Sequence, residues 1–375
     1  LAGWERADWF APQGVDPVHK YSWGKANWFP YQGKEHMAVR NGVGMYDLSS
    51  MHKYLVQGPD AEKVLQRLCA NDVAVPVGRV VYTPVLNDNG GFESDLTVTR
   101  FDADSFFIVT ALGTGVRDFD TIRRGIPAEA RATITDVTHG YAMLAVMGPQ
   151  SRNLLSKLTD ADLSNEAFPF RTAKEIDLAY ARPWAVRISY VGELGWELYI
   201  PSGFATAVFD ALMAAGSEFD LRLVGMQAVN SLRLEAGLRH WESDIGPEDT
   251  PYEAGLGFGV RLDKEGFIGR EALVQQKKSA LKRKLVMFTL DDAEALLFQN
   301  EPIYRDGKQV SQITSGAYGF KIGSAVGFGY LSNKDVITDK WILDGHYEIM
   351  VEGRKIPAKV HLRSPYDPNN ERSKM

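Results

Sequence analysis

Hydrophobic and polar positions follow the same order in two stretches of the chain, residues 56–68 and residues 146–158. Each stretch begins with apolar, partly β-branched residues that favour a strand, and then reaches a Gly-Pro pair that ends it. Polar residues follow, and after them apolar residues at helical spacing, which is typical of a helix start. Two copies of a strand, a turn and a helix predict a pseudo-duplicated α+β core. They are too few for a solenoid.

Alternating apolar residues and glycine turns predict more strands between and after these copies, and helical periodicity predicts two more helices. The strands are expected at residues 80–86, 95–100, 106–110, 185–190 and 196–200, and the helices at residues 204–215 and 227–235. From about residue 284 the pattern changes to short strands and turns, which favours a separate C-terminal β barrel or jelly roll. These strands are expected at residues 284–290, 309–314, 325–331, 346–351 and 355–362.

Large aromatic residues are concentrated at the N-terminus, where four of the eight tryptophans fall within the first 28 residues: Trp4, Trp9, Trp23 and Trp28. So many large apolar groups need a surface to pack on. Prolines and the lack of a helical period argue against a helix here. We therefore expect an extended segment at residues 1–30, a two-lobed core at residues 31–276 and a barrel domain at residues 277–375. Because the chain opens at Leu1, we also expect a piece of a longer polypeptide or a subunit docked on a partner.

Composition narrows the class of protein. The 375 residues exceed the roughly 250–300 that one core supports, so two or three domains are expected. A net charge of −6 gives no electrostatic case for nucleic-acid binding. The basic cluster at residues 277–284 is interpreted as a linker. The alternative is a site that binds the polyanionic tail of a ligand.

Several features that the sequence lacks bear on cellular location and metal binding. No apolar run approaches the roughly 18 residues that cross a membrane, and no signal peptide is recognisable. The single cysteine, Cys69, fits a reducing compartment, so a cytoplasmic location is expected, or the mitochondrial matrix in a eukaryote. The seven histidines are widely spaced, so no metal site is predicted.

Two carboxylates lie four residues apart in the run Tyr190-Val-Gly-Glu193-Leu-Gly-Trp-Glu197. The run predicts a strand, a glycine turn that holds Glu193, and a second strand on which Glu197 stands among apolar and aromatic residues. A carboxylate accepts two parallel N–H bonds, so such a slot suits a flat heterocycle with adjacent donors, for example a pterin. The alternative is a hairpin with Glu197 on its solvent-facing side.

The order of these runs resembles the aminomethyltransferase family, whose type member is the T-protein of the glycine cleavage system. It is most similar to the folate-binding C-terminal half of dimethylglycine and sarcosine dehydrogenases and oxidases. The runs that carry the resemblance are residues 44–51, 86–99, 190–197, 231–237 and 267–273, together with 4–12 and 364–368, which look specific to the dehydrogenase branch. The resemblance implies a three-lobed α+β fold, in which the pseudo-duplicated core and the barrel surround a channel that holds tetrahydrofolate.

Matched residue by residue, the resemblance implies that Asp95 is the catalytic acid beside the folate N5/N10 edge. A carboxylate there can relay the protons that the folate nitrogens lose as the carbon is captured. Glu197 is expected to grip the pterin, and Tyr190 to pack near it. The alternative for Asp95 is a residue that closes the preceding glycine turn.

Four more residues are expected to line the folate site. Met51 matches an apolar wall of the channel, although a plain core methionine is the alternative, and Tyr82 is expected to contribute backbone and shape. Arg233 matches a family arginine that binds folate or pairs with Glu235 or Asp244. Thr110 occupies a position where the T-protein tends to have an asparagine.

Two departures concern the chemistry. The T-protein commonly shows an arginine four residues before Arg233, where this chain has Val229, and an asparagine where this chain has Thr110; both argue against a lipoyl-protein-dependent reaction. No G-x-G-x-x-G motif follows an N-terminal strand, so no flavin site is expected in this chain. We therefore expect capture of a one-carbon unit from a methylated amine, which an upstream oxidising domain or subunit releases. The alternatives are a stand-alone folate-dependent methyltransferase and a non-catalytic folate-binding module.

Overall fold

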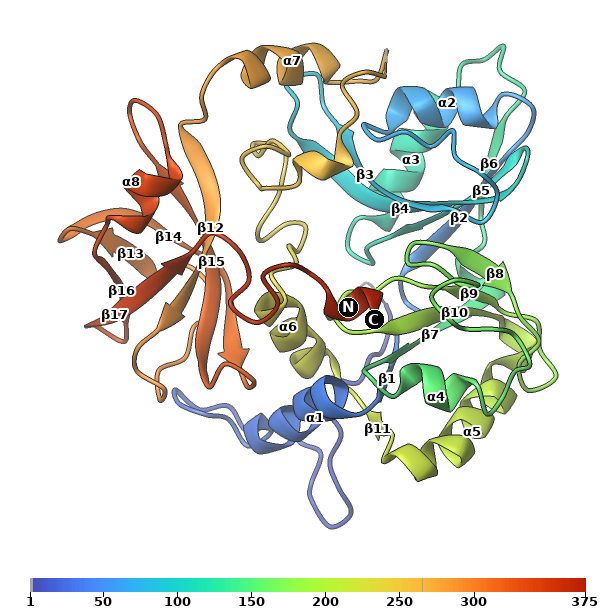
Figure 1. The fold of residues 1–375 in the computed structure, drawn as a ribbon, viewed down its shortest axis with the longest axis horizontal. Helices are drawn as coiled ribbons and strands as arrows, with labels where there is room; N and C mark the ends of the chain where they lie inside the picture. The colour runs from blue at the N-terminus through green and yellow to red at the C-terminus, as the bar shows by residue number, and fades with distance from the viewer. Residues whose placement is uncertain (1–2, 265) are drawn as a thin grey trace.

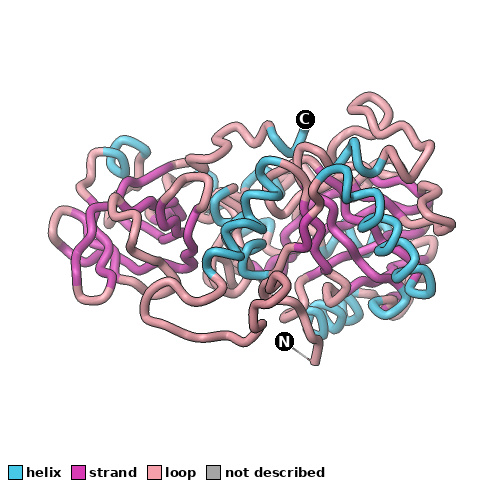
Figure 2. The backbone as a smooth tube through the Cα atoms, turned by 90° about the horizontal axis from the view of Figure 1, so that it is seen from below, coloured by secondary structure: helices cyan, strands magenta, loops and turns pink. Residues whose placement is uncertain are grey.

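The computed structural model describes residues 3–264 and 266–375, so Leu1 lies outside the described residues. Figure 1 shows three lobes around a central helix, α6 (Met226–Glu235). Two lobes are built on open sheets and the third on a closed barrel. Figure 2 shows the barrel strands as a group apart from the other strands, with helices between the groups. The expected α+β fold with three lobes is confirmed.

The N-terminal segment, residues 3–28, contains no helix or strand in the part that is described, and it packs along the core. Trp9 is buried and its ring stacks on Tyr31 with centroids 5.4 Å apart. Trp4 stacks on His139 at 5.3 Å, and Trp28 meets His19 edge-on at 4.9 Å. Trp23 does not pack on this chain, because it is 93% exposed, and its packing on a partner stays a prediction.

The helix α1 (Phe29–Asn41) follows directly, and the sequence pattern did not predict it. Pro30 lies in its first turn, where a proline costs no hydrogen bond. The helix buries polar and charged side chains more than apolar ones: Gln32, Glu35, His36 and Arg40 are all buried. An apolar stripe at helical spacing is therefore missing, and the helix depends on buried polar contacts instead.

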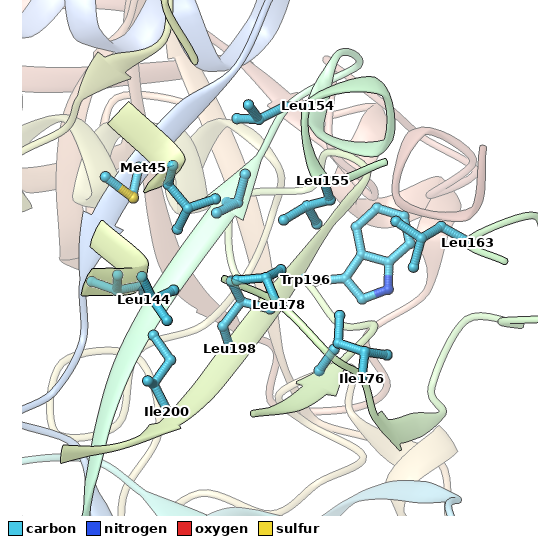
Figure 3. Packing of buried hydrophobic residues seen from close by; sticks show 14 of the residues in the cluster. Met45, Leu144, Leu154, Leu155, Leu163, Ile176, Leu178, Trp196, Leu198 and Ile200 are labelled. Carbon is cyan, nitrogen blue, oxygen red and sulfur yellow. The ribbon is translucent and has the colours of Figure 1, made fainter. Parts of the chain in front are cut away.

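The first lobe contains a six-stranded sheet within the described residues. Its strands run in the order β11 (Arg222–Leu223), β1 (Gly44–Asp47), β7 (Tyr141–Met147), β10 (Gly195–Pro201), β9 (Trp184–Val186) and β8 (Ala173–Glu175). Helices α4 (Ser151–Leu155) and α5 (Ala205–Gly216) cover one face. Figure 3 shows the buried cluster on that face, with Trp196 and Leu198 of β10 among its members.

The second lobe contains a five-stranded sheet, counted over the residues that the structure describes. The order is β3 (Val80–Leu86), β4 (Phe92–Asp102), β5 (Ser105–Thr110), β2 (His52–Gln57) and β6 (Thr133–Asp136). Helices α2 (Ala61–Leu68) and α3 (Gly115–Gly125) lie beside it (Figure 1). The predicted hairpin around residues 87–91 is confirmed as the connection of β3 to β4.

The internal repeat is confirmed as the pairs β2–α2 and β7–α4, one in each sheet-based lobe. Each strand ends at a glycine with a left-handed backbone, Gly58 with φ 126° and Gly148 with φ 129°. A Cβ atom on Gly58 would lie 2.2 Å from the Arg131 carbonyl oxygen, and one on Gly148 would lie 2.3 Å from that of Gly42. The same sharp corner therefore serves both copies, and only glycine fits it.

The third lobe is a closed barrel of short antiparallel strands, as expected. In barrel order they are β12 (Arg283–Leu290), β15 (Ser324–Ser332), β14 (Lys308–Gly319), β13 (Pro302–Arg305), β16 (Tyr347–Val351) and β17 (Arg354–His361). The short strand β13 was not predicted, and neither was the helix α8 (Asp339–Leu343). The basic cluster spans the end of α7 (Arg270–Lys278) and the start of β12, so it connects the core to the barrel.

Helix α6 holds the lobes together, because it is buried on both sides. Leu232 packs in the cluster beneath the first sheet, and Leu234 packs against barrel residues that include Phe328. Asp244, in the connection after α6, accepts hydrogen bonds from Thr314 and Ser315 of β14, each at 2.6 Å. The acidic, turn-rich stretch that begins at Asp244 is thus a structured connection.

Candidate functional site

Glu197 lies on a strand that is buried on both faces. In β10, Trp196, Leu198 and Ile200 face the cluster of Figure 3, whereas Tyr199 belongs to a second cluster on the opposite face. Because side chains alternate along a strand, Glu197 shares the face of Tyr199. It is only 8% exposed. The alternative of a solvent-facing Glu197 is therefore wrong.

The carboxyl group of Glu197 has one hydrogen bond within the described residues, from the Tyr199 hydroxyl at 2.7 Å. Burial raises its pKa to about 7, and the bond from Tyr199 opposes that rise only in part. The strand register aligns Tyr46 of β1, Ala145 of β7 and Glu197 in one row across the sheet. The Tyr46 hydroxyl is buried and has no hydrogen-bond partner among the residues that the structure describes. An unpaired donor thus lies on the same sheet face as a poorly paired carboxyl group.

Asp95 stands four residues inside the strand β4 after the turn. The turn is closed by Asn87, whose side-chain oxygen accepts from the backbone N–H groups of Asn89 and Gly91 at 3.0 Å each. Asp95 itself accepts a hydrogen bond from the Tyr82 hydroxyl at 3.2 Å. Its side chain stays partly exposed, yet the surrounding protein desolvates it enough to raise its pKa to about 6. A carboxyl group with this pKa can both accept and donate a proton near neutral pH.

Tyr190 lies in the irregular connection between β9 and β10, because the predicted strand 185–190 ends at Val186. Its hydroxyl donates to the carbonyl oxygen of Arg239 at 3.1 Å. Burial raises the pKa of Tyr190, the positive charge of Arg233 opposes the rise, and the negative charge of Asp95 adds to it. Burial raises the pKa of Tyr46 well above its ordinary value, and the charges of Glu197 and Tyr190 add to the rise.

Met51 and Thr110 are placed differently from each other. Met51 is half-buried and packs against the cluster that contains Tyr46 and Tyr199. Thr110, at the end of β5, is buried and its hydroxyl donates to the carboxylate of Asp118. The same carboxylate oxygen also accepts from Ser94 at 2.9 Å. The hydroxyl of Thr110 is therefore already engaged inside the protein.

Arg233 of α6 is paired with Asp244, at 2.6 Å, rather than with Glu235. Its side chain is 3% exposed and also donates to the side chain of Asn230 at 2.9 Å. A pocket of about 440 Å³ opens beside it, lined also by His240, Ser243 and Thr314. A larger hollow of about 770 Å³ lies between α1 and the 3₁₀ turn Ser217–Phe219, and it contains none of the residues predicted for the site.

Four residues beside these groups were missed from the sequence: Tyr46, Asp118, Tyr199 and Arg239. Tyr199 could have been found, because it follows Glu197 by two residues on the same strand face. The other three come from distant parts of the chain and carry no local pattern. Asp118 matters because its negative charge raises the pKa of Asp95 further, after desolvation.

Two expectations about absent features can be set beside the structure. Across residues 3–264 and 266–375, no group of three or more histidine, cysteine, aspartate or glutamate side chains is arranged to hold a metal ion. Within the same residues, every helix is too short or too polar to cross a membrane.

Two α+β lobes with a repeated strand–helix unit, a closed six-stranded barrel in the described residues, and inward-facing carboxyl groups define an aminomethyltransferase-type fold. Comparison with known families agrees. The GCVT N-terminal domain matches residues 1–264, and the glycine cleavage T-protein C-terminal barrel domain matches residues 283–367. The chain belongs to the aminomethyltransferase (glycine cleavage T-protein) family.

Individual relatives fall into two groups. The chain is 40% identical to the 4-methylaminobutanoate oxidase (formaldehyde-forming) of Paenarthrobacter nicotinovorans, over 99% of this chain and 44% of that protein. It is 36% identical to human mitochondrial sarcosine dehydrogenase, over 99% of this chain and 45% of that protein. An aminomethyltransferase from Halothermothrix orenii is 36% identical over 87% of this chain and 89% of its own length. The chain thus spans less than half of the first two relatives.

A solved structure supports the same fold. The crystal structure of the glycine cleavage system aminomethyltransferase T from Bartonella henselae superposes with a TM-score of 0.79 and is 25% identical in sequence. The match covers 92% of this chain and 93% of that one. The resemblance read from the sequence is therefore confirmed.

Proposed function

We propose that this chain binds tetrahydrofolate and captures a methylene or formaldehyde unit from demethylation of a methylated amine, giving 5,10-methylenetetrahydrofolate. The observation that carries the proposal is the carboxyl group of Glu197, which is buried on an inner face and receives one hydrogen bond in the described part of the chain. Its remaining acceptor capacity suits the adjacent N–H donors of a pterin. The unpaired hydroxyl of Tyr46 offers a second polar contact on that sheet face.

The proposed division of work follows from the environment of each group. Glu197 would bind the pterin edge, Tyr190 would pack near the ring, and Met51 would supply an apolar wall. Asp95 would move the proton that a folate nitrogen loses as the new C–N bond forms, with Tyr82 holding its carboxyl group in place. Closing the bridge from formaldehyde releases its oxygen as water, so the same acid can return the proton to the departing hydroxyl.

Arg233 and Thr110 are proposed to act less directly. The guanidinium group of Arg233 is paired with Asp244. Arg233 would therefore form part of the wall of the folate site rather than pair with a folate carboxylate. Thr110 holds Asp118 and would help to fix the end of β5 near the catalytic acid. Within this scheme we propose residues 31–276 as the folate-binding core and residues 277–375 as the barrel domain that closes it.

The source of the one-carbon unit is proposed to lie outside this chain. The two oxidising relatives are more than twice as long as the stretch they share with it. We therefore propose an upstream oxidising domain or subunit that demethylates an amine and delivers the carbon. The stand-alone methyltransferase remains the second candidate, because the Halothermothrix orenii relative is matched over 89% of its length.

The test is the substitution Asp95→Asn, assayed by condensation of formaldehyde with tetrahydrofolate. The amide keeps the shape of the side chain, so folate affinity should stay within a few fold. Loss of a positioned acid–base group should slow the condensation by roughly 10²- to 10⁴-fold. The matched control is Asp88→Asn in the exposed turn of the same hairpin.

The outcomes separate the candidates. If Asp95→Asn condenses formaldehyde as fast as the parent chain, Asp95 is a structural residue. If neither protein accelerates condensation although both bind folate, the chain is a non-catalytic binding module. Transfer from an N-, O- or S-methyl donor without formaldehyde would favour the stand-alone methyltransferase.

A further inference from the structure

The last residues of the chain return from the barrel to the core. We name residues 364–375 the C-terminal strap and residues 187–194, the connection between β9 and β10 that carries Tyr190, the tyrosine loop. Figure 1 shows the strap, in red, crossing from β17 to the centre of the molecule. Ser364 starts it by donating to the carbonyl oxygen of Glu235 at 2.8 Å, while its hydroxyl accepts from the backbone N–H of Tyr366 at 3.1 Å.

The strap binds the second half of the tyrosine loop through Glu193, whose carboxylate is buried. The Tyr366 hydroxyl donates a hydrogen bond to the Glu193 carboxylate at 2.5 Å, and the Nε–H group of Arg372 donates one to the same carboxylate at 2.9 Å. Arg40 of α1 reaches the same carboxylate at 2.9 Å and also donates to the carbonyl oxygen of Val191 at 2.6 Å. Two of the three side chains that bind Glu193 therefore come from the strap.

The strap also binds the start of the tyrosine loop. Arg187, which is 1% exposed, donates to the carbonyl oxygen of Met375 at 2.7 Å. Its other terminal nitrogen donates to the carbonyl oxygen of Phe168 at 2.6 Å. The strap thus contacts the loop on both sides of Tyr190, once at Arg187 and once at Glu193.

Positive and negative side chains balance around Glu193. Arg40 also pairs with Glu235 at 2.8 Å, so two guanidinium groups, Arg40 and Arg372, face two carboxylates. Burial opposes ionisation of Glu235, but its hydrogen bond with His36 and the charges of His36 and Arg40 outweigh this and lower its pKa to about 2. Buried ion pairs of this kind fix one geometry more than they add stability, and removing one partner leaves a charge uncompensated.

We propose that the C-terminal strap positions Tyr190 for the pterin, with Arg372 and Tyr366 acting as positioning residues through Glu193. The proposal rests on the folate function proposed above. It goes beyond the family comparison, because the match to the barrel domain ends at residue 367 and Arg372 lies after it.

The test uses the full chain with Arg372→Met, and Lys374→Met as the matched control in the same strap. Lys374 is exposed, and its side chain has no hydrogen bond or ion pair among the described residues. Arg40 and Tyr366 still hold Glu193 in the Arg372 variant, so the protein should fold. Tyr366→Phe, which removes one hydrogen bond and keeps the ring, is the second variant.

Two measurements are made on each protein. Hydrogen exchange of the amides in residues 187–194 reports the loop without any ligand, and we expect it to be about 10-fold faster in Arg372→Met than in the control. Titration with tetrahydrofolate should give a Kd about 10-fold higher, the usual cost of one charge-assisted bond. At saturating folate, the rate of methylene transfer should stay within two-fold, roughly, because Asp95 is untouched.

A double-mutant cycle with Tyr190→Leu separates positioning from general destabilisation. If the strap acts through Tyr190, the loss of folate affinity caused by Tyr190→Leu shrinks in the Arg372→Met background. Additive losses overturn the proposal, and so does unchanged exchange of the tyrosine loop. If titration of the parent chain with tetrahydrofolate shows no binding, the proposed folate function is wrong. The hydrogen-exchange measurement alone then decides whether the strap holds the loop.

Discussion

At the scale of residues, two carboxyl groups are held in surroundings that oppose their ionisation. Burial raises the pKa of Glu197 to about 7 and that of Asp95 to about 6, and each carboxyl group accepts a hydrogen bond from a tyrosine hydroxyl. A folded chain gains nothing from such groups by itself, since an ionised carboxylate is more stable in water. Perturbed carboxyl groups of this kind concentrate at functional sites. The free-energy cost of burying these two carboxyl groups is consistent with a ligand that supplies further hydrogen-bond donors to them.

Glu197→Gln should therefore stabilise the free chain above neutral pH. The folded-state pKa of about 7 lies above the ordinary 4.5, so this group lowers stability progressively as pH rises from about 4.5 to 7, in full above pH 7 and not at all below about pH 4.5. The gain should be about 3 kcal/mol at pH 8 and should vanish toward pH 4.5, as measured by urea unfolding across this range. The exposed Glu175 on β8 gives the control, Glu175→Gln, whose stability should follow the parent.

The same variant should bind folate more weakly, because an amide N–H₂ group would face a pterin donor. The expected loss is about 10- to 150-fold in Kd by titration calorimetry. In the parent, affinity should rise as pH increases to about 7 and then level off, since the ionised carboxylate is the acceptor. Equal affinity of the two proteins at pH 8 would remove Glu197 from the site.

At the scale of elements, the sequence pattern predicted the parts that alternate or repeat. The two strand–helix copies, the hairpin at residues 87–91 and five of the barrel strands in the described chain all follow from local periodicity. The helix α1 was missed because its buried face carries Glu35, His36 and Arg40 instead of an apolar stripe. The strand before Tyr190 was predicted too long, because β9 ends at Val186 and the Arg187 backbone then bonds to Arg171 and Thr172, just before β8.

The candidate site could be predicted only where family motifs mark it. Asp95, Glu197 and Tyr190 stand in recognisable runs, and their joint role in one folate site stays a prediction. Some of their neighbours carry no local sequence pattern because they come from other elements. Tyr46 reaches the row of Glu197 through the register of β1, β7 and β10, and Asp118 reaches Thr110 from α3. Such partners are set by strand pairing over long separations.

The corner between β7 and α4 gives a prediction at this scale. Gly148→Ala would place a Cβ atom 2.3 Å from the Gly42 carbonyl oxygen and 2.8 Å from that of Val39, at a φ of 129°. Backbone atoms cannot yield as a side chain does, so we expect a loss of about 3 kcal/mol or more in urea unfolding. Gly140→Ala is the control, because a Cβ atom there meets nothing within 4 Å. A loss below about 1 kcal/mol in Gly148→Ala would show that the corner can relax.

At the scale of the whole molecule, buried polar contacts join parts that are distant in sequence. Asp244 links α6 to the barrel through Arg233, Thr314 and Ser315. The N-terminal segment is joined to the core in the same manner. Glu35 of α1 accepts from the backbone N–H of Phe10 at 2.7 Å and from that of Gly225 at 2.8 Å. These hydrogen bonds fix the arrangement of the lobes. Apolar contacts alone would fix it less specifically, because they are not directional.

The N-terminal segment should behave as part of the folded core. The backbone oxygens of Ala7 and Asp8 accept from the N–H groups of Met226 and Gln227 at the start of α6, each at 3.0 Å. Trp9 is 7% exposed beside these contacts, whereas Trp23 is 93% exposed. Trp9→Ala should therefore cost about 3–5 kcal/mol in urea unfolding, and Trp23→Ala less than about 0.5 kcal/mol. Limited proteolysis should leave the segment intact in the Trp23 variant and remove it early in the Trp9 variant. Rapid loss of the segment from the parent chain, with folate binding unchanged, would show instead that it is a tail on which the site does not depend.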